Sequence, residues 1–169
     1  GDGGYLAFLG RMSPEKRPDL AIEIAERVGL PLKMAAKVDG ADREYFASVV
    51  EPRLRQSRYA EYIGELDDTG KNEFLGSARA LLFPIDWPEP FGLAMIEALA
   101  CGTPVIAFDR GSVPEVIRHG VSGFIVNSVD EAARAVESLH MIDRADCRAE
   151  FEQRFAASRM ARDYLDVYA

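Results

Sequence analysis

The chain has 169 residues, which is enough for one domain with a hydrophobic core of its own. Its composition, 48% hydrophobic and 28% charged, is typical of a globular protein and argues against disorder. A formal net charge of −8 argues against nucleic acid as a partner, because binding to a phosphate backbone needs a basic face. A local basic pocket for one small anion is compatible with that charge.

The chain opens on GDGG, ahead of the first predicted strand. A dinucleotide-binding fingerprint needs its glycines between a strand and a helix, so we interpret this stretch as a linker or a cloning remnant. Short β-rich runs then alternate with helical patterns. We predict strands at 5–10, 32–38, 60–66, 80–85, 104–109 and 123–127. We predict helices at 18–29, 42–56, 71–78, within 89–104, and at 113–120 and 128–139.

Local signals define several helix ends. Pro18 suits a first helical turn, and Gly29 can end the helix that follows it. Pro52 falls late in the predicted helix 42–56. Ser128 and Glu131 form a capping box, in which two side chains satisfy backbone amides at the start of a helix.

Alternating strands and helices predict the fold. Parallel strands need a crossover helix between them, so six strand–helix units predict a six-stranded parallel sheet, doubly wound and Rossmann-like. In such sheets ligands bind at the carboxyl ends of the strands, which makes the loops there the candidate functional regions.

The segment from Arg144 onward has no strand signal. We expect one domain over 1–169, made of a sheet part at 5–142 and a helical tail at 143–169. The tail helices have no sheet of their own to cover, so they either wrap the back of the domain or reach toward a partner. The tail aromatics that follow helical patterns are Phe151, Phe155, Tyr164 and Tyr168.

The cysteines and histidines restrict the possible chemistry. Cys101 and Cys147 lie far apart and lack the spacing of metal ligands, so we expect two thiols in a reducing compartment. Only two histidines are present, His119 and His140, which excludes a histidine-rich metal site. No apolar run is long enough to cross a bilayer and no signal peptide is recognisable, so we predict a cytoplasmic protein.

The loop GRMSPEKRP follows the first predicted strand. It places Arg11 and Lys16 beside a helix N-terminus, and Gly10 allows a close approach of the backbone. Two fixed cations next to helix amides suit a diphosphate. The alternative is a basic loop that is simply solvated.

The segment PIDWPEPFGLAMIEALACG follows the fourth predicted strand. Its three prolines stiffen the loop, and Gly92 near the helix start exposes amides that can receive an anion. Glu89 stands at the mouth of this helix, where a carboxylate can accept hydrogen bonds from sugar hydroxyls.

Glu97 is the only charged residue between Phe91 and Ala100, about two turns inside a helix that we expect to be buried all round. A buried carboxylate without partners costs several kcal/mol, so it must be paired or bound. A vicinal diol such as ribose supplies two donors to one carboxylate. The alternative is that Glu97 pairs with an arginine or caps a backbone group.

The loop DRGSVPEVI follows the fifth predicted strand. Gly111 and Ser112 stand where a strand turns into a helix, which predicts a possible anion nest. Glu115 is either a partner of the helix dipole or a ligand contact. No nucleophile and base share a motif anywhere in the chain, so the sequence indicates a domain that binds and orients a substrate.

Five stretches of the sequence resemble the retaining nucleotide-sugar glycosyltransferases of family four (group 1), which have the two-domain GT-B fold. The stretches are GRMSPEKRPDLAI, YIGEL, LLFPIDWPEPFGLAMIEALACGTPVIAF, GSVPEV and GVSGFIV. They come in the family's order and spacing and cover nearly all of residues 5–168. The long tryptophan-to-phenylalanine stretch is the most specific of them.

The resemblance implies catalytic roles for three residues. Arg11 and Lys16 would hold the donor diphosphate and stabilise charge on the departing nucleotide, and Glu89 would contact hydroxyls of the transferred sugar. It also implies donor contacts by Gly10, by amides around Phe91, Gly92, Leu93 and Ala94, by Glu97 to the ribose, and by Lys37, Glu65 and Leu66 to the base. Arg17 departs from the family, which often has glycine there.

The resemblance further implies that an N-terminal acceptor domain is missing and that the tail 143–169 would cross back onto it. The chain then looks like the C-terminal donor domain of a bacterial enzyme of polysaccharide or glycoconjugate biosynthesis, inactive or nearly so alone. It would transfer a hexose with retention, without metal or cofactor, from a nucleotide sugar, with a UDP-sugar such as UDP-glucose favoured. The full-length enzyme could sit at the inner membrane, with any membrane contact made by the missing domain.

Two other functions remain open at the level of sequence. One keeps the fold but changes the reaction to that of a GT-B epimerase or phosphorylase, although no motif for either is present. The other is a non-catalytic nucleotide-binding module of flavodoxin-like form, which would leave the glutamates and cations of the two loops unexplained.

Overall fold

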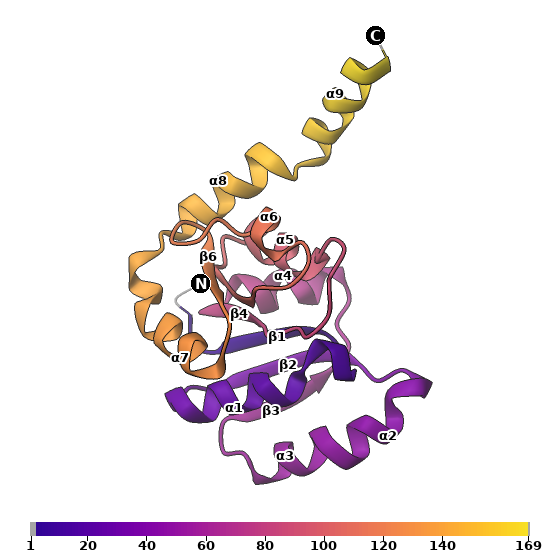
Figure 1. Ribbon diagram of the computed structural model, residues 1–169, viewed down its shortest axis with the longest axis vertical. Coiled ribbons are helices and arrows are strands. Elements are labelled where there is room, and N and C mark those ends of the chain that lie inside the picture. Colours follow the sequence, from indigo (N-terminus) through magenta and orange to yellow (C-terminus); the bar gives the residue numbers. More distant parts are fainter. Residues whose placement is uncertain (1–2, 169) are drawn as a thin grey trace.

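The computed structural model describes residues 3–168, and Figure 1 shows its arrangement. Its centre is a six-stranded sheet in the order β3-β2-β1-β4-β5-β6, and every neighbouring pair is parallel. The strands are β1 (Leu6–Arg11), β2 (Leu32–Lys37), β3 (Ala60–Gly64), β4 (Ala80–Phe83), β5 (Val105–Phe108) and β6 (Gly123–Val126). The predicted doubly wound, Rossmann-like sheet is confirmed. The first two residues of the opening GDGG lie outside the described residues.

The helices follow the strands along the chain and cover both faces of the sheet (Figure 1). They are α1 (Pro18–Val28), α2 (Arg43–Tyr45), α3 (Glu51–Gln56), α4 (Asp68–Gly76), α5 (Leu93–Ala100), α6 (Val113–Val116), α7 (Val129–Glu137), α8 (Arg144–Arg154) and α9 (Ala157–Tyr168). A 3-10 turn, η1 (Pro14–Lys16), lies between β1 and α1. α1 and α7 lie against each other on one face, while α4, α5, α6 and α8 cover the other.

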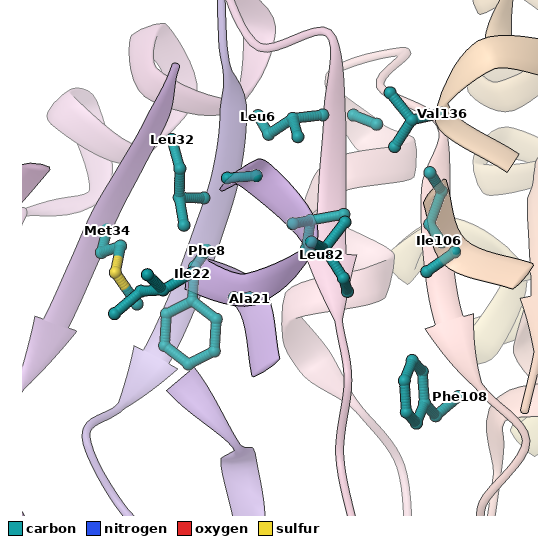
Figure 2. Packing of buried hydrophobic residues seen from close by; sticks show 14 of the residues in the cluster. Leu6, Phe8, Ala21, Ile22, Leu32, Met34, Leu82, Ile106, Phe108 and Val136 are labelled. Carbon is teal, nitrogen blue, oxygen red and sulfur yellow. The ribbon is translucent and has the colours of Figure 1, made fainter. Parts of the chain in front are cut away.

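The strands supply a separate core to each face. Leu82 and Ile106 point toward α1 and α7, while their neighbours Leu81 and Val105 point toward α4 and α5. Figure 2 shows the first of these cores, with Val136 of α7 beside Ile106 and with Leu82 between Ile106 and the residues of α1. Strands buried on both faces carry continuous apolar runs, and this is why the strand patterns could be found in the sequence.

The predicted helix 42–56 forms, but with a defect. Between α2 and α3 the chain makes a π-helical turn, η3 (Phe46–Val50). Pro52 has no amide to donate to Ser48, so the regular hydrogen-bond ladder cannot continue through this point. A proline late in this helix therefore changes the ladder without ending the helix.

Helix ends differ from the prediction at two places. α4 begins three residues before the expected start, because the side chain of Asp67 accepts a hydrogen bond from the amide of Gly70 at 2.7 Å. α6 ends at Val116, well before the predicted end of helix 113–120. Ile117 is extended and buries its side chain in the core, which turns the chain toward β6.

The predicted capping box at the start of α7 is present in a shifted form. The hydroxyl of Ser128 accepts from the amide of Glu131 at 3.2 Å, as expected. The Glu131 carboxylate accepts from the amide of Asn127 at 2.7 Å, one residue before the cap. Two backbone donors are still satisfied reciprocally.

The two halves of the tail behave differently. α8 packs against α5, and Phe151 and Phe155 lie against the core on that side. α9 extends away from the body of the domain (Figure 1), and Tyr164 and Tyr168 are exposed. The first alternative, packing against the domain, holds for α8. That α9 meets a further domain stays a prediction.

Three further observations concern the thiols, the possible metal ligands and the length of the helices. Cys147 is buried, Cys101 is half-buried, and both are free thiols. Within residues 3–168 no group of histidine, cysteine and acidic side chains is arranged to hold a metal. None of the described helices has both the length and the apolar character needed to cross a membrane.

Candidate functional site

A cavity of about 450 Å³ opens at the carboxyl ends of β1 and β4. Its size falls within the usual range for small-molecule sites. One wall comes from β1 and the loop after it, another from the loop after β4 and the start of α5, and a third from α4. Its lining residues are Leu9, Gly10, Arg11, Lys16, Lys71, Phe83, Glu89, Phe91, Gly92, Leu93, Ala94 and Glu97.

Most of the residues predicted for donor binding therefore meet in one cavity. The structure brings together Gly10, Arg11, Lys16, Glu89, Phe91, Gly92, Leu93, Ala94 and Glu97. Lys37, Glu65 and Leu66 do not line it, and Lys37 forms an ion pair with Asp39 at 2.7 Å. Their contact with a base stays a prediction. Leu9, Lys71 and Phe83 line the cavity and were not foreseen.

The loop after β1 supplies two cations of unequal freedom. Arg11, the last residue of β1, is about half exposed and pairs with Glu15 at 2.8 Å and Asp39 at 3.7 Å. Lys16 is mostly buried and pairs with Glu89. Its ammonium group also lies over the rings of Phe83 and Trp87, at 5.7 and 5.6 Å from their centroids. These contacts fix Lys16 at the cavity wall.

Glu89 is held by the protein as well as facing the cavity. Its Oε2 receives hydrogen bonds from Lys16 and from the indole of Trp87, the latter at 3.0 Å. Burial alone would raise the pKa of Glu89, but the bonds from Lys16 and Trp87 outweigh it and lower the pKa below its usual value. The carboxylate is therefore ionised at neutral pH and fixed in place.

The loop after β5 supports Glu89 from behind. The amide of Ser112 donates to the backbone carbonyl of Glu89 at 2.8 Å. Gly111 has φ +55°, and a Cβ there would lie 2.4 Å from both N and O of Glu89. The Ser112 amide is therefore already occupied and not free for an anion, which counts against the possible anion nest at Gly111 and Ser112. Glu115 does not line the cavity either.

The start of α5 presents backbone amides to the cavity. Gly92 precedes the helix with φ +75°, a conformation that favours glycine, and its carbonyl accepts from the amide of Met95 at 3.0 Å. The first amides of a helix have no acceptor within it. Those of Leu93 and Ala94 therefore stand at the cavity wall with the positive end of the helix dipole, an arrangement that suits an anion.

Glu97 is not buried, which corrects the expectation for this helix. Its side chain is 40% exposed and lines the cavity, one turn after the first residue of α5. α5 buries the face that carries Met95, Ile96, Ala98 and Leu99, and leaves Glu97 on the open side. Its partner is Lys71 of α4, with Nζ and Oε1 3.6 Å apart, and not an arginine.

Arg17 is neither a cavity residue nor a solvated charge. It has φ +50°, which is unusual without glycine, and its guanidinium binds both carboxylate oxygens of the buried Asp19. It also lies 3.6 Å from Asp86 in the loop after β4. The hydroxyl of Tyr45 donates to Asp19 at 3.0 Å. This network ties the loop that carries Lys16 to α1 and to the loop that carries Glu89.

Comparison with known protein families decides the assignment, because residues 1–155 match the family described as glycosyl transferases, group 1. The chain belongs to this family. Among curated relatives, a D-inositol 3-phosphate glycosyltransferase of Mycobacterium leprae is 31% identical over 145 residues, covering 82% of this chain and 33% of the relative. A protein of the same name from Streptomyces bingchenggensis is 29% identical over 181 residues, covering 96% and 39%. The chain thus spans between a third and two fifths of the length of these relatives, 33% and 39%.

Solved structures show the same fold for this group 1 domain. HepE of Anabaena, crystallised in complex with UDP, superposes with a TM-score of 0.88 at 18% identity, over 99% of this chain and 49% of that one. The C-terminal domain of LpcC, a group 1 protein of Francisella tularensis, superposes with a TM-score of 0.76 at 19% identity, over 92% and 88%. The fold is that of the C-terminal half of a GT-B glycosyltransferase, as predicted.

Proposed function

We propose that this group 1 domain binds a nucleoside diphosphate sugar, with a UDP-sugar favoured, for transfer of the hexose to an acceptor held elsewhere. The observation that carries the proposal is the meeting of Arg11, Lys16, Glu89, Glu97 and the first amides of α5 around one cavity. Two cations and a helix N-terminus suit a diphosphate, and two carboxylates suit hydroxyl donors. The structures of HepE with UDP and with UDP-glucose support this choice of ligand.

The cations would act on the leaving group. When the bond between the anomeric carbon and the diphosphate breaks, negative charge develops on the terminal phosphate. Arg11, Lys16 and the amides of Leu93 and Ala94 line the cavity where they can stabilise that charge without rearranging. These groups can do the work of a metal in this step, so we propose a metal-independent reaction. That the reaction retains the anomeric configuration is proposed from the resemblance to the family alone.

The two glutamates would recognise the two sugars of the donor. Glu89 is fixed beside Lys16, the proposed diphosphate ligand, so we assign Glu89 to the hexose. Glu97 lies one turn into α5 and would accept hydrogen bonds from the ribose hydroxyls. Each neutral hydroxyl bonded to a carboxylate contributes about 1.5–3 kcal/mol, and more than that is lost if the carboxylate is left unpaired.

Transfer itself needs groups beyond this domain. The matched relatives are about three times as long, which leaves room for an acceptor-binding domain. We propose that the tail 143–169 contacts that domain and that the present chain alone binds donor but turns over poorly. The two free thiols support a cytoplasmic location, where reducing conditions preserve them.

The test is thermal unfolding of the chain with UDP, GDP, ADP and their sugars, in EDTA. Binding at 100 times the dissociation constant stabilises a protein by about 2.7 kcal/mol, which raises Tm by several degrees. Lys16→Met should abolish the shift, and Lys33→Met, a lysine on the strand next to β1, should keep it. A chain whose Tm responds to none of these ligands at millimolar concentration would refute the proposal.

A further inference from the structure

Lys71 is the cavity residue that the proposed function does not use. It lies on α4, whereas Arg11 and Lys16 belong to β1 and the turn after it, and it lines the same cavity. Its ammonium is 3.3 Å from Asp68 and 3.6 Å from Glu97. Glu97 lines the cavity beside it.

The charge of this cluster decides what it can bind. Asp68, Lys71 and Glu97 together carry a net charge of −1, since one ammonium stands between two carboxylates. A diphosphate is repelled by a net negative cluster, whereas neutral hydroxyl donors are attracted to its free carboxylate oxygens. Arg11, Lys16 and the α5 amides occupy the part of the cavity that suits an anion. We therefore assign Lys71 to its carboxylate neighbour in the cavity, Glu97, and leave the phosphates to the groups at that anion-binding part.

We propose that Lys71 is a positioning residue, which holds the Glu97 carboxylate turned into the cavity so that it can accept hydrogen bonds from both ribose hydroxyls. This inference rests on the proposed function. The neighbouring Glu97 raises the pKa of Lys71, so the ammonium stays charged throughout the physiological range. The Lys71 ammonium donates one of its three N–H groups to the Asp68 carboxylate, which limits the directions in which the ammonium can point.

Calorimetric titration of the chain provides the test. Three probes are used. The first is whichever of UDP, GDP and ADP binds the wild type most tightly, the second is the 2′,3′-dideoxy form of that nucleotide, and the third is inorganic pyrophosphate. The wild type should prefer the nucleotide with both hydroxyls by about tenfold or more, because each lost bond is to a charged acceptor. Lys71→Met should reduce this preference at least about threefold, because the hydrogen bonds from the ribose hydroxyls to Glu97 are weakened. It should leave the binding of pyrophosphate unchanged, because pyrophosphate has no ribose.

Three controls separate positioning from a general effect on the fold. Lys33→Met, which changes a lysine that stacks on Tyr5 away from the cavity, should keep the full preference. Lys71→Arg should restore most of it. In a background of Glu97→Gln, Lys71→Met should cause no further loss, because a residue that acts through Glu97 has nothing left to position. Unchanged Tm values would confirm that each variant folds.

The outcomes are distinct. If the wild type binds a nucleotide with the hydroxyl preference but Lys71→Met retains it, the inference about Lys71 is wrong and the proposed function stands. If Lys71→Met weakens the nucleotide, its dideoxy form and pyrophosphate equally, Lys71 contacts the phosphates and the inference is again wrong. If the wild type binds none of the three nucleotides, the proposed function fails and the inference fails with it.

Discussion

The two carboxylate–ammonium pairs of the cavity, Lys16–Glu89 and Lys71–Glu97, differ in burial and in distance, and we expect them to have different roles. In the Lys16–Glu89 pair the side chains are 17% and 11% exposed, and in the Lys71–Glu97 pair they are 31% and 40% exposed. The first pair is in direct contact, while the atoms of the second are 3.6 Å apart. Breaking the buried first pair would be costly, so this pair stabilises the site. The exposed second pair contributes little to stability, and its carboxylate is accessible to a ligand.

The surroundings of the pairs repeat this contrast. Glu89 is supported by Trp87 and by the loop at Gly111, and Lys16 lies beside the network of Arg17 and Asp19. Glu97 has a single charged neighbour at its carboxylate among the described residues, Lys71. Removing parts of the first pair should therefore change stability and binding together, and removing parts of the second should change binding alone.

The largest effect on stability is expected for Lys16→Met. It leaves the Glu89 carboxylate mostly buried without its ion partner, which should lower the free energy of unfolding by about 3 kcal/mol. Lys71→Met, made in the exposed pair, should lower it by less than about 0.5 kcal/mol. Urea denaturation measures both. If Lys16→Met and Lys71→Met cost the same, the contrast between the pairs is not real. Adding Glu89→Gln to Lys16→Met should recover part of the loss.

Gly111→Ala should come next, at about 2 kcal/mol, from the cost of a side chain at positive φ together with the clash of its Cβ. That Cβ would meet the backbone of Glu89, so nucleotide binding should weaken as well. Gly120→Ala is the matched control, because it has φ +79° and no atom within 4 Å of the added Cβ. It should destabilise the chain and leave binding intact. Equal loss of binding in both variants would show that Gly111 does not position Glu89.

Asp19→Asn should lower the free energy of unfolding by about 1.5 kcal/mol through loss of charged hydrogen bonds to Arg17. Burial raises the pKa of Asp19, but the bonds from Arg17 and Tyr45 outweigh it, so the pKa lies below its usual value. A carboxyl with a lowered pKa stabilises the fold fully above about pH 4, and this is lost as the pH falls through the folded-state value.

Urea denaturation between about pH 2 and pH 6 therefore tests the Asp19 network, since this range spans the ordinary titration of a carboxyl. The wild type should lose stability below about pH 4 more steeply than Asp19→Asn, because only the wild type takes up a proton at this position. Parallel curves for the two proteins would show that Asp19 does not carry the charge interaction. Glu89, whose pKa is also lowered, adds to the acid sensitivity of both.

The smallest effect on stability is expected for Glu97→Gln, below about 0.5 kcal/mol, because an exposed ion pair contributes little. Its effect on the nucleotide should nonetheless be about tenfold or more in affinity, since charged acceptors of the ribose hydroxyls are lost. Glu115→Gln, outside the cavity, should change neither quantity. A Glu97→Gln variant that loses stability but keeps its affinity would reverse the roles of the two pairs.

Sequence alone predicted the parts of this molecule that depend on neighbouring residues. Apolar strand runs such as 80–85, and proline and glycine around the start of α5, fixed the order of elements and placed Lys16, Glu89 and Gly92 in loops at one sheet edge. That edge is where the cavity lies.

The predictions that failed concern residues whose environment depends on how separate helices and loops pack against each other. Glu97 was expected to be buried, because its helix is apolar on either side of it in sequence, but α5 turns that residue toward α4. Lys71 could not be found, since no local spacing links it to a carboxylate on the next helix. The support of Glu89 by Gly111 likewise joins two loops that only the sheet brings together.

The most direct test of the central claim is NMR mapping of backbone amide shifts as UDP is added to the chain. The claim predicts changes at Gly10 to Lys16 and at Phe91 to Glu97, around the cavity at the β1 and β4 edge. A second cavity of about 590 Å³ lies between α5 and α9, lined by residues that include Ile96, Met160 and Tyr164. Shifts confined to α9, or no shifts at millimolar UDP, would contradict the claim that the first cavity is the donor site.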